Sequence, residues 1–154
     1  MALAGGVALA LGSPAAAHAE TPSPDEVAWC VLNANCTTAV DVKDWALRTA
    51  QWKYPESFAT DGKGDAFRHC IWAGALSQRV GYDTAYTAVM IHEYDEGGSS
   101  TATMDAFNDY VGLELGPRAD SARPKNAWGW IVDECEQRAE NQELFGLDGV
   151  RGAY

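Results

Sequence analysis

The stretch that decides the fold covers residues 65–81 and reads DAFRHCIWAGALSQRVG. Asp65, His69 and Trp72 follow one another at intervals of three or four residues, which places them on one face of an α-helix. Gly81 supplies the C-cap with which such a helix commonly ends. The pattern predicts a helix whose inward face is interrupted by a carboxylate and an imidazole.

The rest of the chain also shows helical spacing, and no segment alternates polar and apolar residues over more than a few positions. Ser23-Pro24 and Asp83 are expected to begin helices, while Gly97-Gly98 and Gly116-Pro117 are expected to end them. These patterns predict an all-α single domain, a helical bundle of about six helices. The expected helices cover residues 24–33, 38–53, 65–80, 84–96, 99–115 and 128–144.

The first residues are typical of an export signal. Residues 1–19 contain no charged side chain, carry an apolar run from Ala2 to Leu11, and end in the cleavage pattern Ala17-His18-Ala19. Because no basic residue precedes the run, we expect the natural start to lie upstream of Met1 or the segment to be truncated. No apolar run is long enough to span a bilayer. The expected division is a signal peptide at 1–19, a linker at 20–24, a helical domain at 25–146 and a loose tail at 147–154.

The net charge excludes one class of partner. The chain has 22 acidic and 11 basic residues, a formal charge of −11, and all of these charges follow the expected cleavage site. Such a field repels phosphate backbones, so we do not expect nucleic acid as a partner. Together with the export signal, this predicts a secreted extracellular protein whose substrate or partner is extracellular or part of the cell envelope.

Four cysteines in an exported chain most simply form two disulfides. Three pairings are possible, and their spacing does not fit a zinc ribbon. We prefer a local Cys30–Cys36 bridge and a long-range Cys70–Cys135 bridge. The long-range bridge would tie the helix of residues 65–80 to the last helix.

Two other helices repeat the interruption seen at His69. His92 and Asn108 both fall at expected core positions of their helices. Burying such groups without partners costs roughly 1–3 kcal/mol each. We therefore expect Asp65, His69, His92 and Asn108 to contact one another, a metal or water in one shared polar centre.

One interpretation of this centre is a catalytic metal. His69, His92 and Asp105 would hold zinc or another divalent cation, with an open position for water. Glu93 or Asp65 would accept a proton from that water, whose pKa the metal lowers toward neutrality. The zinc-protease motif H-E-x-x-H fails, because Glu96 stands where its second histidine is required.

Two metal-free interpretations remain open. In one, His69 or His92 acts as a general base that Asp65 orients, and Arg68 or Asn108 stabilises developing negative charge. In the other, the polar centre is a satisfied hydrogen-bond network with a purely structural role. The sequence accordingly predicts a hydrolase, with a non-catalytic secreted interaction domain and a toxin-type effector domain as alternatives.

Three motifs of this chain resemble a bacterial domain family of unknown function. They are D-A-x-R-H-x-x-W from Asp65, His92-Glu93, and M-D-x-x-N from Met104. That family is found in exported proteins and at the C-termini of rearrangement-hotspot-repeat and wall-associated toxins. The chain departs from its pattern at Asp109, where the family has a second asparagine. The resemblance implies the candidate site Asp65, Arg68, His69, His92, Glu93, Asp105 and Asn108, and it implies no reaction.

Tryptophan is abundant, with six residues in the chain. Tryptophans can line a carbohydrate groove, but helical spacing favours core packing for most of them. Trp72 is the exception, because it lies one turn beyond His69 on the same face. The six are Trp29, Trp45, Trp52, Trp72, Trp128 and Trp130.

Overall fold

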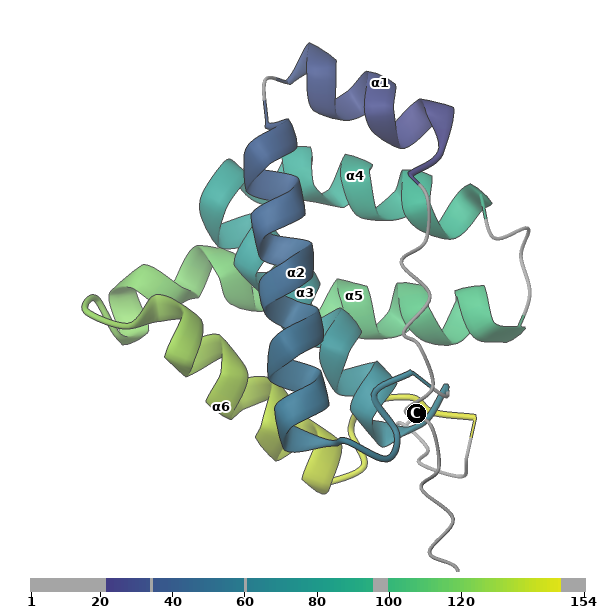
Figure 1. Cartoon of the computed structure of the whole chain (residues 1–154). Coiled ribbons are helices and arrows are strands. Elements are labelled where there is room, and N and C mark those ends of the chain that lie inside the picture. The colour runs from purple at the N-terminus through teal and green to yellow at the C-terminus, as the bar shows by residue number, and fades with distance from the viewer. Residues whose placement is uncertain (1–21, 34, 60, 96–99, 148–154) are drawn as a thin grey trace, which may run out of the picture.

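The computed structural model describes residues 22–33, 35–59, 61–95 and 100–147 (Figure 1). Within these ranges the chain forms six helices and no strand, which confirms the expected all-α bundle. The expected signal segment and most of the expected tail lie outside the described residues. The helices are α1 (Pro24–Leu32), α2 (Cys36–Lys53), α3 (Lys63–Val80), α4 (Tyr82–Asp95), α5 (Ser100–Ala122) and α6 (Ala127–Glu140).

Helix α3, which contains the quoted stretch, is the centre of the bundle. It contacts α2, α4, α5 and α6, and most of its side chains are buried. Phe67, Ile71 and Leu76 are at most 1% exposed and belong to the apolar core. In Figure 1, α2 crosses α3, while α4 and α5 run beside each other on one side of the bundle. A helix covered on so many sides can bury polar groups away from bulk water.

Small residues let α3 and α5 approach closely. A Cβ atom at Gly112 would overlap the backbone carbonyl of Cys70, and one at Gly116 would lie 2.5 Å from the Cβ of Ser77. Neither position therefore accepts a side chain without moving a backbone. This close contact fixes the register between α3 and α5, and with it the positions of the polar residues that both helices carry.

Helix α5 does not end at Gly116-Pro117, and that prediction was wrong. The helix continues to Ala122 with Pro117 inside it. A proline has no N–H, so the carbonyl of Leu113 loses its normal helical partner. The buried hydroxyl of Ser77 donates to that carbonyl at 3.0 Å and replaces the lost bond. A side chain from α3 thus satisfies the interrupted helix, which the sequence of α5 alone could not reveal.

We expect Ser77→Ala to destabilise the protein by about 1–3 kcal/mol, because it leaves the buried Leu113 carbonyl without a donor. In a Pro117→Ala background the restored N–H can bond to Leu113, so the same Ser77 substitution should cost much less. Urea unfolding of the wild type, both single variants and the double variant measures this difference. An equal cost of Ser77→Ala in both backgrounds would refute the compensation.

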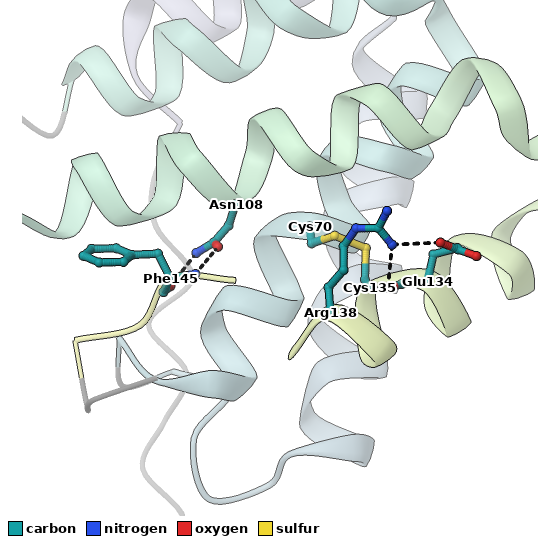
Figure 2. The surroundings of a disulfide bond; sticks show 6 residues. All are labelled: Cys70, Asn108, Glu134, Cys135, Arg138 and Phe145. Carbon is teal, nitrogen blue, oxygen red and sulfur yellow. Dashed lines mark hydrogen bonds and ion pairs between the residues drawn. A yellow bond between two sulfur atoms is a disulfide. The ribbon is translucent and has the colours of Figure 1, made fainter. Parts of the chain in front are cut away.

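Both expected disulfides are present. Cys30 and Cys36 join α1 to α2, and Cys70 joins Cys135 of α6 with Cα atoms 5.9 Å apart (Figure 2). The long-range bridge lies fully within the apolar core, one residue after His69. It therefore anchors α3 from the side of α6.

Several expected boundaries and one expected core residue differ from the structure. Helix α4 begins at Tyr82, so Asp83 lies inside its first turn and does not cap it. Helix α6 ends at Glu140 and not at Leu144, because Gln142 adopts a left-handed φ of 61° and turns Leu144 back into the core. Trp52 is 78% exposed and lies outside the core. No helix in the described ranges has the length and hydropathy needed to cross a membrane.

Candidate functional site

The site is built around His69, on the second turn of α3. Its imidazole is only 2% exposed and meets the edge of Trp72 at a centroid distance of 6.1 Å. Helices α3, α4 and α5 each bring carboxylates to this ring, and none of these groups is more than 6% exposed. We call the following five residues the His69 centre: Asp65, His69, Glu93, Asp105 and Asp109.

The Nε2 side of the ring faces two carboxylates and a guanidinium. Asp105 Oδ1 lies 3.4 Å and Asp65 Oδ1 lies 3.9 Å from Nε2. Arg68 donates from Nε to Asp65 Oδ1 at 2.8 Å, and its Nη2 lies 2.9 Å from His69 Nε2. Because a guanidinium can only donate, Nε2 is the acceptor and the ring proton is on Nδ1. Arg68 therefore acts as the cation on this side of the ring.

The Nδ1 side of the ring faces two further carboxylates. Asp109 Oδ1 lies 3.3 Å and Glu93 Oε1 lies 3.9 Å from Nδ1. The other oxygen, Asp109 Oδ2, is buried and accepts no hydrogen bond from any residue that the structure describes. Two neighbouring carboxylates that are both buried favour a shared proton or a bound cation.

Burial dominates the ionisation of the centre. It raises the pKa of Asp109 well above the usual range, and the neighbouring Glu93 raises it further. Burial likewise raises the pKa of Asp65, although Arg68 opposes this change. Burial, with Arg68 second, holds the pKa of His69 well below its usual value. His69 is therefore neutral at neutral pH, which is the form that binds metals.

These residues make two groups that could hold a metal ion. One joins Asp65, His69 and Asp105, and the other joins His69, Glu93 and Asp109. In each group the candidate ligand atoms lie within 4.8 Å of one another. The set expected from sequence, His69 with His92 and Asp105, is not one of the groups found among the described residues.

His92 lies near the His69 centre but is paired elsewhere. Its ring centroid is 6.5 Å from that of His69 and 5.2 Å from that of Trp72. Its Nδ1 lies 2.8 Å from Glu26 Oε1 on α1. The same Glu26 completes a capping box with Ser23. The sequence pattern Ser23-Pro24-Asp25-Glu26 indicates that capping box, but nothing in it indicates the contact with His92.

Asn108, also expected in the site, has a different role. Its Nδ2 donates to the carbonyl of Phe145 at 2.8 Å, and its Oδ1 accepts from the Phe145 N–H at 2.9 Å (Figure 2). The fully buried amide thus holds the segment after α6 as a backbone partner would. Asn108 therefore positions the C-terminal segment.

Asp109 is the member of the centre that sequence reasoning passed over. It is fully buried, although it departs from the resembled pattern. The usable indication was its spacing: Asp105 and Asp109 are four residues apart, so they share one face of α5. Of the remaining expected residues, Asp65, Arg68, Glu93 and Asp105 surround His69 directly.

Comparison with known proteins identifies one related family. A family model described as "Domain of unknown function (DUF6973)" matches residues 28–143. That range includes the whole His69 centre. No curated protein and no solved structure is significantly similar to the chain.

Proposed function

The chain belongs to this domain family of unknown function, and from its own polar centre we propose that the protein is a metal-dependent hydrolase. The divalent cation would be bound by His69 Nδ1, Glu93 and Asp109. The observation that carries this proposal is the buried carboxylate pair beside a neutral imidazole, with one Asp109 oxygen that accepts no hydrogen bond from the described residues. Such a set lacks positive charge and offers the nitrogen and oxygen ligands that zinc and similar cations bind.

The ligand spacing supports a cation at this position. Two ligands that bind one cation tetrahedrally at the usual 2.0–2.2 Å lie about 3.3–3.6 Å apart. The separation between His69 Nδ1 and Asp109 Oδ1 is 3.3 Å, and that between Nδ1 and Glu93 Oε1 is 3.9 Å. Only a small shift of Glu93 would complete the set. Because His69 Nδ1 carries the ring proton in the metal-free arrangement, binding would require the proton to move to Nε2. There the Asp105 carboxylate, 3.4 Å away, would accept it in place of the contact with Arg68.

Arg68 favours the Nδ1 group over the Nε2 group. Its guanidinium bonds to Asp65 and lies against His69 Nε2, so a metal there would have to displace it. The same contact argues against His69 as a metal-free general base, because Arg68 already uses the Nε2 lone pair. Asp65 and Asp105, which face Nε2, are better suited to hold the ring from behind, and Arg68 holds Asp65.

The proposed hydrolysis depends on the charges of the bound cation and of Arg68. A divalent cation, when bound, would lower the pKa of a water molecule toward neutrality and so favour hydrolysis. Arg68 is a cationic side chain in contact with the centre, and it is 22% exposed. Because Arg68 lies on the side of the ring opposite the proposed metal, we propose that it acts as a positioning residue that holds Asp65 beside the ring. The substrate class is an extracellular or cell-envelope compound.

An exported location is part of the proposal. The expected signal segment and the resemblance to exported and wall-associated proteins support it, and the two disulfides fit an oxidising compartment. Disulfides persist poorly where thiols are kept reduced. A fusion of the chain's first residues to a reporter enzyme that is active only outside the cytoplasm would test export separately from catalysis.

Elemental analysis tests the metal. Purified protein loaded with zinc or manganese and exhaustively dialysed should retain about one equivalent of metal by plasma mass spectrometry. Asp109→Asn and His69→Ala should lose it, whereas His92→Ala should retain it, because His92 is paired with Glu26. A metal-free wild type, or an Asp109→Asn variant that keeps its metal, would contradict this assignment. Loss in His69→Ala and His92→Ala, with retention in Asp109→Asn, would restore the ligand set expected from sequence.

Activity is tested next on the same preparations. A panel of chromogenic esters, phosphoesters and peptides should include a substrate whose hydrolysis stops with a chelator and returns with the retained metal. Asp109→Asn should reduce kcat at least about a hundredfold on that substrate, since it removes a ligand of the catalytic ion. Circular dichroism of the variant controls for folding. Metal binding without any hydrolysis would leave a structural metal centre and refute the enzyme.

A further inference from the structure

A second feature lies away from the His69 centre, where the C-terminal part of α2 meets the start of α6. It is a surface cleft of about 490 Å³, a size common for ligand sites. Three of the six tryptophans line it: Trp45, Trp52 and Trp128. No lining residue belongs to the His69 centre, so the cleft can be considered independently of the proposed catalysis.

The tryptophans of the cleft differ in exposure. Trp45 and Trp128 are partly buried and in contact, with ring centroids 4.5 Å apart. Trp52 is 78% exposed, with Lys53 Nζ 5.6 Å from its ring centroid. A large aromatic ring left in water at the edge of a cleft offers apolar area to a ligand.

The polar groups of the cleft are balanced in charge. Lys53 pairs with Glu136, and Arg123 Nη2 lies 2.8 Å from Asp133 Oδ2. Each cation is thus already neutralised, although the whole chain carries a charge of −11. This arrangement does not favour a strongly charged ligand of either sign, because neither sign meets an excess of the opposite charge.

The remaining polar groups can exchange hydrogen bonds with a neutral ligand. Asn126 uses its Oδ1 to accept from the Gly129 N–H, and its side-chain amide carries two further donors on Nδ2. Thr49 donates to the Trp45 carbonyl, and its hydroxyl oxygen remains an acceptor. Aromatic surface therefore lies beside uncharged donors and acceptors.

We infer that this cleft binds a neutral oligosaccharide. A sugar ring has apolar C–H groups on its faces and hydroxyls around its edge, which matches indoles beside amide and hydroxyl groups. Charge balance separates this ligand from sulfated or uronic sugars. The exposed Trp52 would stack on one ring of the chain, and the Trp45–Trp128 pair would contact its neighbour.

Indole nuclear magnetic resonance tests the site directly. The protein with isotope-labelled tryptophan should give six indole N–H signals. Titration with chitotetraose or cellotetraose should shift those of Trp45, Trp52 and Trp128 and leave Trp29 and Trp130 unchanged. A sulfated heparin tetrasaccharide should not shift them. The inference is overturned if neither neutral sugar shifts the cleft signals at millimolar concentration, if the heparin fragment binds more tightly, or if the shifts lie only outside the cleft.

Substitution provides the second measurement. Trp52→Ala should weaken binding of the neutral tetrasaccharide about five- to tenfold, since one aromatic contact is lost. Because Trp52 is exposed, the melting temperature of the Trp52→Ala protein should stay near that of the wild type. Tyr86→Ala is the matched control, because Tyr86 is an exposed aromatic residue of α4 outside the cleft and should leave affinity unchanged. Equal affinities for all three proteins would overturn the inference.

Discussion

In metal-free protein, the stability of the wild type relative to Asp109→Asn is expected to fall as the pH rises from about 4 toward neutrality. The folded state raises the pKa of Asp109 through burial and through the neighbouring Glu93. A carboxyl with a raised folded pKa contributes stability below its unfolded pKa and loses that contribution as the pH rises through the folded value. The loss approaches about 1.4 kcal/mol per pH unit while only the unfolded state is ionised.

Urea unfolding of both proteins with chelator, at intervals between about pH 4.5 and 8, measures this difference. Asp65 and His69 titrate in both proteins and act in opposite directions. The lowered pKa of His69 gives stability that is present above its unfolded pKa and is lost as the pH falls through the folded value. Comparison with the nearly isosteric asparagine therefore isolates Asp109. Parallel curves for the two proteins would show that Asp109 has no raised pKa.

Metal gives the same experiment a second readout. A saturating divalent cation replaces the proton that Asp109 and Glu93 share, so it should stabilise the wild type increasingly as the pH rises. With metal, the free energy of unfolding of the wild type should therefore change with pH in the opposite direction. The pH dependence of Asp109→Asn should be the same with and without metal. A cation that stabilises both proteins equally would have bound elsewhere on this acidic chain.

Local patterns in the sequence were sufficient to predict the fold class. The capped start at Ser23 and the stop at Gly81 are set by residues within one helical turn, and both are seen. Pro117 misled because the group that compensates it, Ser77, lies 40 positions earlier on another helix. Helical spacing favoured a core position for Trp52, which is exposed, because that spacing does not say how wide the buried face of α2 is.

The candidate site was predictable in location but not in its partners. Asp65, His69 and His92 interrupt apolar faces, and burying them requires compensation wherever the helices meet. The choice between His92 and Asp109 as neighbours of His69 depends on helix rotation, which the sequence does not fix. His92 is instead paired with Glu26, which lies 66 positions earlier in the chain. Such long-range pairs need the packed structure.

The second large expected change in stability concerns the disulfide between Cys70, which follows His69 on α3, and Cys135. Replacing Cys70 and Cys135 by alanine is expected to destabilise the protein by about 4 kcal/mol, because the bridge closes a long loop of the unfolded chain with a sequence separation of 65. Both cysteines are fully buried in the core cluster, so the cavity left by the sulfur atoms adds to this loss. Calorimetry and urea unfolding under oxidising conditions measure the total.

The short bridge is the matched control. Cys30 and Cys36 are separated by only 6 positions, so their replacement should cost about 2 kcal/mol by the same loop-closure argument. The bridge between α3 and α6 should also matter more to the site, since Cys70 follows His69 directly on α3. Metal retention should therefore fall in the Cys70/Cys135 variant and persist in the Cys30/Cys36 variant. The reverse order of stability or of metal retention would show that α1, and not α6, holds the His69 centre in place.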